Sequence, residues 1–286
     1  RTSEGQKLEA LTAQIVVSTV NLAARFSRWG IPKGHFDVLC VDEAGQATEP
    51  EVVAVASSLM DFFPDDKQHI PIAQMILAGD PKQLGPVMTS SLCKKLGLGI
   101  SYMERLSRLS LYERKDGSFP SALVTMLVKN YRSHPAILKL PNEMFYDGDL
   151  RTCGDQFTTY DMSKWEHLPR KGFPVMFHAI EGENLRESNS PSWFNPQEVE
   201  AVLHYVRLLL HETKPGLRQD EIGIITPYAR QAQKIRQVLK TQGMNDIKVG
   251  SVEIFQGQER RVIIISTVRA EAENLSSDIR LHLGFV

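Results

Sequence analysis

Six short apolar runs recur along the chain, most of them separated by stretches with the amphipathic pattern of helices. The runs are Gln14–Val20, Asp37–Val41, Gln74–Asp80, Val175–Ile180, Ile222–Tyr228 and Arg261–Val268. Most are continuously apolar rather than alternating, as expected for strands covered on both faces. The amphipathic stretches include Glu51–Phe63, Asn195–Glu212 and Ala229–Gly243. This order predicts an α/β protein with mainly parallel sheets flanked by helices.

The chain has 286 residues, which is enough for one large or two medium-sized domains. We predict a domain boundary after Val128, which gives domains 1–128 and 129–286. Two segments rich in Gly, Pro, Asn and Ser, Cys153–Pro174 and Glu181–Pro196, are typical of surface loops. The N-terminus lacks a Met and a helix-like stretch leads directly into an apolar run, so we expect a piece of a longer protein.

Composition excludes several classes of protein. The net charge of −1 gives no general attraction to nucleic acid, so such a partner would need a local groove. The three cysteines, Cys40, Cys93 and Cys153, are far apart, which argues against a disulfide framework or a structural zinc site and favours a reducing compartment. No apolar run is long enough to span a membrane, and we expect a monomer without a membrane partner.

Polar residues follow most of the predicted strands. They are Ser18-Thr19, Asp42-Glu43, Asp80, Thr226 and Ser266-Thr267. In open α/β sheets, ligands bind beyond the carboxyl ends of the strands. Five such polar termini therefore predict a shared functional edge.

The stretch "DVLCVDEAG" places two adjacent acids, Asp42 and Glu43, at the end of an apolar run. One interpretation is a helix start, where acids are favourable. The other is a magnesium-nucleotide site, in which one carboxylate holds the metal, largely through water, and the second activates the attacking water. Gly45 would let the backbone turn tightly after these acids.

The stretch "LAGDPKQLGP", Leu77–Pro86, follows the next apolar run. Its Gly79-Asp80-Pro81 makes a sharp turn from which Gln83 would project. A Gln side chain donates and accepts hydrogen bonds at once, which suits a γ-phosphate or a hydrolytic water. The alternative is a solvated turn between a strand and a helix.

These two stretches, together with "NYRSHP" (Asn130–Pro135), "IGIITPY" and "GSVEIFQGQE" (Gly250–Glu259), carry a resemblance to a known family. The chain resembles superfamily 1 helicases of the up-frameshift type over almost all of its length. It is most similar to the Moloney leukaemia virus 10 branch, also called Armitage-type, of RNA-silencing helicases. The branch assignment depends on "NYRSHPAIL", "GFPVMFHAI", "NSPSWFNPQE" and "KVGSVEIFQGQE". The resemblance implies two RecA-like domains, the first truncated at its N-terminus.

The resemblance implies roles for individual residues. Asp42 would hold Mg²⁺, Glu43 would activate water, Gln83 would sense the γ-phosphate, and Arg132 would be an arginine finger from the second domain. The residues implied to bind ATP are Gly79, Asp80, Tyr131, Gly257 and Glu259. From the sequence alone, Arg132 is also compatible with a structural ion pair, Tyr131 with a core ring, and Glu259 with a solvated acid paired with Arg260 or Arg261.

Contacts to nucleic acid are implied at hydroxyl-bearing strand ends. The residues are Ser18, Thr19, Thr226, Pro227 and Ser251. Hydroxyls and backbone amides suit phosphate contacts that carry no base information. Each residue could instead be a strand terminus or a helix cap. His134 is expected to be structural rather than catalytic.

The implied function is that of an ATP- and Mg²⁺-dependent RNA helicase core, moving 5′ to 3′ on single-stranded RNA, with small-RNA silencing proteins of the Argonaute/Piwi class as partners. The implied location is the cytoplasm, with ribonucleoprotein granules as a candidate site. No G-x-x-x-x-G-K-[ST] loop occurs in the sequence, so this piece alone is expected to hydrolyse ATP poorly. The alternatives are a DNA-directed motor of the same superfamily and a nucleotide-gated RNA clamp.

Overall fold

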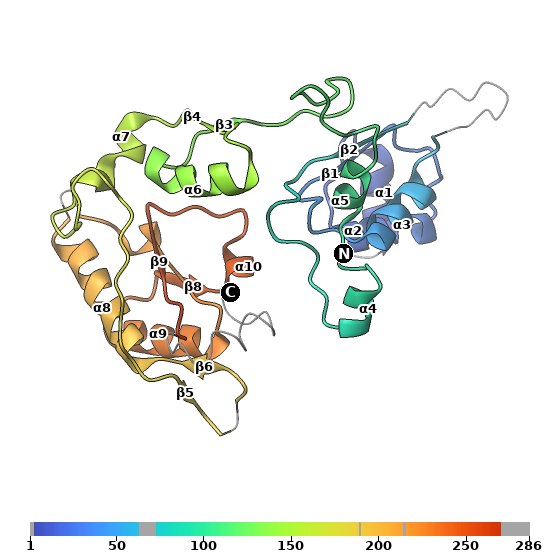
Figure 1. Cartoon of the computed structure of the whole chain (residues 1–286). Helices are drawn as coiled ribbons and strands as arrows, with labels where there is room; N and C mark the ends of the chain where they lie inside the picture. Colours follow the sequence, from blue (N-terminus) through green and yellow to red (C-terminus); the bar gives the residue numbers. More distant parts are fainter. Residues whose placement is uncertain (1–2, 63–72, 189, 214–215, 270–286) are drawn as a thin grey trace. The chain divides into compact units, whose positions relative to one another are not determined.

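The computed structural model describes residues 3–62, 73–188, 190–213 and 216–269. The chain divides into two compact units, Arg1–Met126 (unit 1) and Leu127–Val286 (unit 2), each of which is described by itself (Figure 1). The domain boundary predicted after Val128 stays a prediction. Among the described residues, no helix has both the length and the apolar character needed to cross a membrane.

Unit 1 is built around two paired strands and several helices. Its elements are α1 (Ser3–Thr12), α2 (Val20–Ala23), the 3₁₀ helix η1 (Ser27–Trp29), β1 (Val38–Val41), α3 (Glu49–Leu59), β2 (Gln74–Leu77), α4 (Ser91–Lys95) and α5 (Tyr102–Ser107). Strands β1 and β2 pair in parallel, with Val38 opposite Gln74 and Val41 opposite Leu77. A capping box at Thr48 and Glu51 begins α3, which packs Val55 and Leu59 into the core.

The described residues of unit 2 form three small sheets. Its elements are β3 (Lys129–Asn130), α6 (Pro135–Phe145), β4 (Arg151–Thr152), α7 (Gln156–Thr159), η2 (Asp161–Lys164), β5 (Leu185–Arg186), β6 (Trp193–Phe194), α8 (Pro196–His211), η3 (Gln219–Glu221), β7 (Ile222–Ile225), α9 (Ala229–Thr241), β8 (Lys248–Gly250), α10 (Val252–Phe255) and β9 (Val262–Ile265). The main sheet is parallel with the order β8-β7-β9. Strands β3 and β4 pair in parallel, whereas β5 and β6 form an antiparallel hairpin.

The larger core lies in unit 2. Helix α8 turns Val199, Val202 and Val206 inward, and α9 turns Ile235 and Leu239 inward, at the three- and four-residue spacing of an amphipathic helix. Both helices pack with β7 and β8 in one apolar cluster. The predicted parallel α/β architecture is therefore present in both units.

Two of the predicted strands are wrong. Gln14–Val20 forms no strand, and Ile15 and Val17 are 83% and 92% exposed. Val175–Ile180 also forms no strand, and Phe177 is 89% exposed. Apolar composition alone does not make a strand, because the backbone also needs a neighbouring chain to bond with, and no pairing of either segment with another described strand occurs.

Burial and loops also differ from expectation. The three-residue run Ile222–Ile224 of β7 is fully buried, but residues of β2 and β9 alternate between exposed and half-buried. The expectation of strands covered on both faces therefore holds only for the central strand β7. The segments expected to be loops contain α7, η2 and the β5–β6 hairpin.

Candidate nucleotide-binding and nucleic-acid-binding residues

The acidic pair lies immediately after β1, at an exposed position. Glu43 has a φ of +50°, a left-handed conformation that is uncommon for a residue with a side chain. The Asp42 Oδ1 accepts a hydrogen bond from the Glu43 backbone N–H at 3.0 Å, and Gln46 Nε2 donates to Glu43 Oε2 at 3.3 Å. The turn after β1 therefore holds both carboxylates at the surface with a strained backbone between them.

A close backbone approach joins this acidic loop to the loop after β2. Ala78 N–H donates to the Val41 carbonyl at 2.9 Å, and Ala44 N–H donates to the Ala78 carbonyl at 2.8 Å. A side chain at Gly79 would place its Cβ 2.8 Å from Ala44 N, and one at Gly45 would place its Cβ 2.8 Å from the Asp80 carbonyl oxygen. Both glycines are thus required for the two loops to meet.

Asp80 organises the second loop. Its Oδ1 accepts from Lys82 N–H at 2.9 Å, and its Oδ2 accepts from Gln83 Nε2 at 2.9 Å. The Gln83 amide group therefore donates to Asp80, which leaves its oxygen as the acceptor for another group. The structure brings four of the predicted site residues to one sheet edge: Asp42, Glu43, Gly79 and Asp80, with Gln83 attached through Asp80.

In unit 2, Arg132 and Glu259 form an ion pair, with side chains 60% and 65% exposed. The alternative interpretation, in which Glu259 pairs with the side chain of Arg260 or Arg261, is wrong. Arg260 donates to the Glu259 backbone carbonyl at 2.7 Å, and Arg261 pairs instead with Asp161 and Glu221. The structure therefore joins two residues that the sequence connects only through the family resemblance.

Tyr131 follows β3, and its side chain is 65% exposed. The interpretation of Tyr131 as a core ring is wrong, because its backbone rather than its ring is packed. A side chain at Gly154 would place its Cβ 2.7 Å from the Tyr131 carbonyl oxygen. Asn130 holds the following turn, since its Oδ1 accepts from Arg132 and Ser133 N–H at 3.1 and 2.8 Å. The Tyr131 ring is accessible next to Arg132, and its contact with adenine stays a prediction.

His134 caps helix α6. Its Nδ1 accepts a hydrogen bond from Ala136 N–H at 3.0 Å, and its ring lies edge-on to Tyr160 at a centroid distance of 4.2 Å. Burial lowers the pKa of His134, so the neutral ring that can accept this bond is favoured. These contacts support a structural role for His134.

The residues predicted to contact nucleic acid differ in accessibility. Ser18 and Thr19 are both exposed, and the Thr19 hydroxyl accepts from Leu22 N–H and caps α2. Thr226 is 1% exposed and its Oγ1 has no hydrogen-bond partner among the residues that the structure describes, while Pro227 is half-buried. A hydrogen bond from the Ser251 hydroxyl lowers the pKa of the Glu253 carboxyl group. The contact of these residues with a nucleic acid stays a prediction. Gly257 has a positive φ, and its place in the nucleotide site also stays a prediction.

A buried polar network in unit 2 has no counterpart in the sequence-based predictions. Gln231 Nε2 donates to Ser266 Oγ at 2.9 Å, Ser266 Oγ donates to Glu198 Oε2 at 2.5 Å, and Asn195 N–H donates to Gln231 Oε1 at 2.9 Å. Glu198 Oε1 accepts from Val268 N–H at 2.9 Å. The pattern Asn195-Pro196-x-Glu198 indicates a helix cap. Nothing local in the sequence indicates that Asn195 and Glu198 also form hydrogen bonds with residues after position 230.

Two family models, each described as an AAA domain, match residues 2–91 and 98–286. The chain belongs to this family. Among curated proteins, the "Putative helicase mov-10-B.1" of Danio rerio is 45% identical over 98% of the chain, the human "RNA helicase Mov10l1" is 44% identical over 96%, and the "Probable RNA helicase armi" of Drosophila melanogaster is 37% identical over 96%. The resemblance to Moloney leukaemia virus 10 and Armitage-type helicases is confirmed. The chain covers 28%, 22% and 23% of these three relatives.

The acidic loop of this AAA-domain chain suits a magnesium ion held mostly by other oxygens. Within the residues that the structure describes, no group of three or more His, Cys, Asp or Glu side chains could hold a metal by itself. Mg²⁺ commonly keeps several waters and takes one or two carboxylates plus substrate phosphates. Asp42 would supply the carboxylate. Glu43, which is adjacent but turned by its left-handed backbone, would face the water.

Asp42 belongs to unit 1 and Arg132 to unit 2 of the AAA-domain chain. Their convergence on one triphosphate therefore stays a prediction. Within each unit, however, the structure brings predicted residues together: Asp42, Glu43 and Asp80 in the first, Arg132 and Glu259 in the second.

Proposed function

We propose that the chain is the core of an ATP-dependent RNA helicase that moves 5′ to 3′ along single-stranded RNA and unwinds duplexes. Its two units would be RecA-like domains within a longer parent protein. The names of its relatives, which include "RNA helicase Mov10l1" and "Probable RNA helicase armi", support an RNA substrate. We further propose a cytoplasmic role in small-RNA silencing.

The observation that carries the proposal is the junction of the two post-strand loops. It brings Asp42, Glu43 and Asp80 to one sheet edge, with Gln83 bonded to Asp80 and with Gly45 and Gly79 in the contact, which supports the roles proposed for these residues. An RNA clamp that only binds would not need Glu43, the acid implied to activate water. A rigid base that is already oriented contributes to hydrolysis because less reorganisation is needed in the transition state.

The proposed roles follow from these positions. A Mg²⁺ ion bound with ATP would neutralise charge that develops on the phosphates. Asp42 would hold that ion, and Glu43 would orient and deprotonate the attacking water. Gln83, oriented by Asp80, would register the state of the γ-phosphate. Arg132 would leave Glu259 and place its guanidinium against the phosphate oxygens, which its planar fork fits in pairs.

The test is strand displacement by the full parent protein on duplexes with a single-stranded 5′ or 3′ overhang, made of RNA or DNA. We expect ATP-dependent displacement of RNA duplexes with a 5′ overhang. RNA binding without displacement would support the clamp and overturn the proposal, and a preference for DNA overhangs would support the DNA-directed motor. In the same assay series, the 286-residue chain alone is expected to show little ATP turnover.

A further inference from the structure

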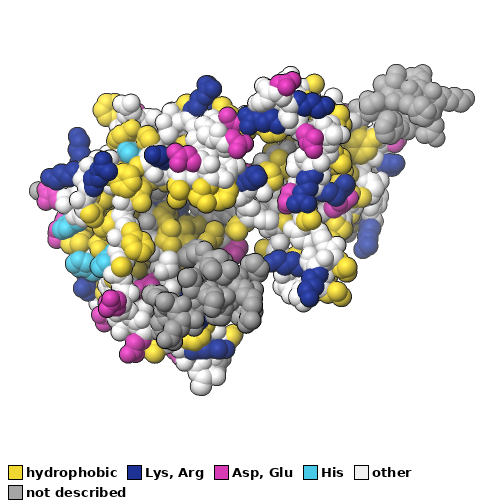
Figure 2. Space-filling model, viewed as in Figure 1, with side chains coloured by type: hydrophobic (Ala, Val, Ile, Leu, Met, Phe, Trp, Pro, Cys, Tyr) yellow, Lys and Arg dark blue, Asp and Glu magenta, His cyan; other side chains and the backbone are white. Residues whose placement is uncertain are grey.

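The β5–β6 hairpin carries aromatic rings that are covered by basic side chains. Arg186 and Trp193 are directly opposite one another across the hairpin, and the Arg186 guanidinium lies 5.6 Å from the centre of the Trp193 ring. The Arg269 guanidinium lies 4.6 Å from the centre of the same ring, and Lys234 Nζ lies 4.9 Å from the centre of the Phe194 ring. Basic and hydrophobic side chains are visible together at the lower edge of unit 2 in Figure 2.

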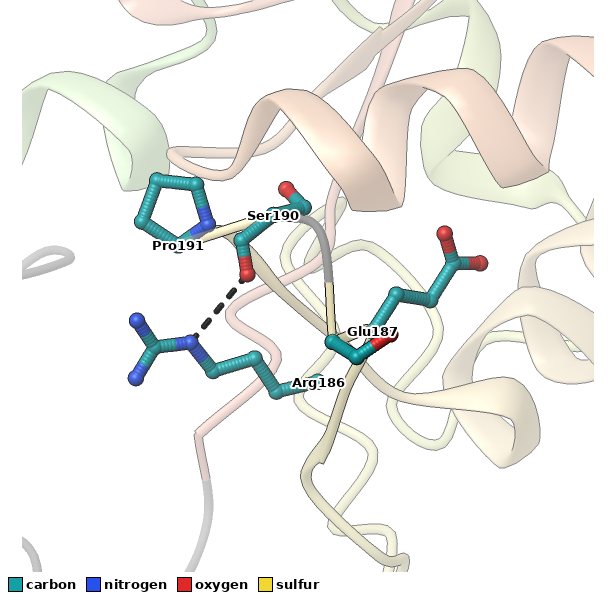
Figure 3. A pocket seen from close by; sticks show the side chains of 5 residues that line it. Arg186, Glu187, Ser190 and Pro191 are labelled. Atoms are coloured by element: carbon teal, nitrogen blue, oxygen red, sulfur yellow. Dashed lines mark hydrogen bonds between the residues drawn. The ribbon is translucent and has the colours of Figure 1, made fainter.

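Among the described residues of this surface, the basic side chains are Arg186, Arg230, Lys234 and Arg269. Glu187 is the acid in the group, and it pairs with Arg230 and with Lys234 Nζ at 2.9 Å. In the shallow pocket at the hairpin turn, the side chains of Arg186 and Glu187 point in opposite directions (Figure 3). Arg186 donates through Nε to the Ser190 carbonyl at 3.2 Å, which leaves its terminal N–H groups for another acceptor.

The arrangement is held by the buried network. Val268 has a φ of +72°, and Arg269 N–H donates to the Thr267 carbonyl at 2.9 Å, so residues 267–269 form a tight γ-turn of the strained kind. Glu198 and Asn195 bond the N–H and the carbonyl of Val268, respectively. A β-branched residue in this conformation is costly, and such strain is found where surrounding structure enforces it. Arg269, the last residue of this turn, lies over Trp193.

We propose that the β5–β6 hairpin, together with Lys234 and Arg269, binds the phosphate backbone of single-stranded RNA. The inference rests on the proposed function, and it adds a site outside the residues implied by the family resemblance. A guanidinium that lies over an aromatic ring is already oriented, and its N–H edge fits phosphate oxygens. An RNA strand thus suits this surface better than an acidic peptide, because stacked Arg and aromatic side chains serve both phosphates and bases.

The surface is continuous with a segment predicted to contact RNA. Arg230 N–H in the first turn of α9 donates to Ser192 Oγ of the hairpin at 3.1 Å. That turn directly follows Thr226 and Pro227. The hairpin is therefore bonded to the segment that follows β7.

The experiment measures binding of a fluorescent single-stranded uridine oligonucleotide to the full parent protein over a range of salt concentrations. Arg186→Gln removes one phosphate contact, so we expect several-fold weaker binding and a slope of log affinity against log salt that is shallower by about 0.7. Arg170→Gln is the matched control, because Arg170 also lies over an aromatic ring, Phe173, at 5.8 Å in the same unit. It should change neither the affinity nor the slope.

A second variant separates binding from folding. Trp193→Leu keeps an apolar side chain in the hairpin, and we expect it to weaken RNA binding while the thermal unfolding midpoint stays close to that of the wild type. The inference would be overturned if Arg186→Gln left the salt slope of RNA binding unchanged. It would also be overturned if Arg186→Gln bound a polyglutamate peptide more weakly than the wild type but bound RNA equally well. If either outcome were found while the parent protein still unwound RNA, only the hairpin inference would fail and the proposed function would stand. A wild type that binds no RNA would overturn both proposals.

Discussion

The ends of the parallel strands differ between the two units. After β1 in unit 1, Asp42 and Glu43 are exposed, and after β2 Asp80 is half-buried. Backbone hydrogen bonds and two glycines hold these loops together. After β7 and β9 in unit 2, Thr226 and Ser266 are buried, and Ser266 joins side chains from α8 and α9. The comparison indicates that one edge presents reactive groups, whereas the other fixes a backbone conformation. Substitutions at the two edges should therefore affect different measurements.

The largest expected effect is on chemistry in unit 1. Glu43→Gln keeps the shape of the side chain but removes the base, so ATP turnover by the parent protein should fall about 10²- to 10⁴-fold. RNA binding and the free energy of unfolding should hardly change, because Glu43 is exposed. Steady-state hydrolysis and RNA anisotropy would measure both quantities.

Asp37→Asn is the control for that change. Asp37 is an exposed acid at the other end of β1, and the hydrogen bond it makes with Gln74 uses its backbone carbonyl. Turnover should stay at the wild-type rate. Equal losses in both variants would show that the effect reflects surface charge and not a base at the strand end.

The second effect is on stability in unit 2. Glu198→Ala leaves Ser266 and Val268 N–H without their buried acceptor, so the free energy of unfolding should fall by about 3 kcal/mol. Glu200→Ala is the control on the same helix, since Glu200 is exposed. Urea unfolding of the 286-residue chain would measure the difference, and equal stability of the two variants would contradict a structural role for the network.

The third effect tests the close approach in unit 1. Gly79→Ala would force a Cβ against Ala44 N and Gly45 N at 2.8 and 2.9 Å, and we expect a loss of about 1–3 kcal/mol. At Gly85 the nearest atom to an added Cβ is 3.7 Å away, so Gly85→Ala should be close to neutral. Thermal unfolding of both variants would show whether the loop junction is as tight as the structure indicates.

The smallest effect concerns pH. Burial lowers the pKa of His134 below its ordinary value of 6.5, so the unfolded chain takes up this proton at a higher pH than the folded chain. The contribution of His134 to the free energy of unfolding is complete above the ordinary pKa, and it is lost as the pH falls through the lowered pKa of the folded state. His134→Asn keeps a capping acceptor but does not titrate, so it should remove this pH-dependent step.

Urea midpoints of the wild type and His134→Asn near neutral pH and at about pH 5.5 would check this prediction. The two proteins should diverge only at the lower pH. A parallel loss of stability in both would assign the pH dependence to other groups.

The sequence predicts elements well where local pattern and packing agree. Helices α8 and α9 are found within a residue or two, since their apolar spacing matches the faces that they bury. The runs Gln14–Val20 and Val175–Ile180 have a similar apolar composition, but they form no strand. Pairing depends on a neighbouring backbone, which composition does not specify.

For the candidate site, motif spacing identifies Asp42, Glu43, Asp80 and Gln83 as one group, and the loop junction brings them together. It does not reveal that Glu259 pairs with Arg132, because these residues are 127 positions apart. Nor does it reveal the strain at Val268, which arises from hydrogen bonds to Glu198, 70 positions earlier.

The sequence by itself determines the order of apolar and amphipathic segments and the polar residues that follow them. Periodicity and chain direction fix which side chains come at the end of each strand. Which of these ends stays exposed and which becomes a buried network was decided only by the tertiary structure. The reason is physical: burial and hydrogen-bond partners depend on segments far apart in the chain, and a carboxylate such as Glu198 is tolerated inside only when those segments supply its donors.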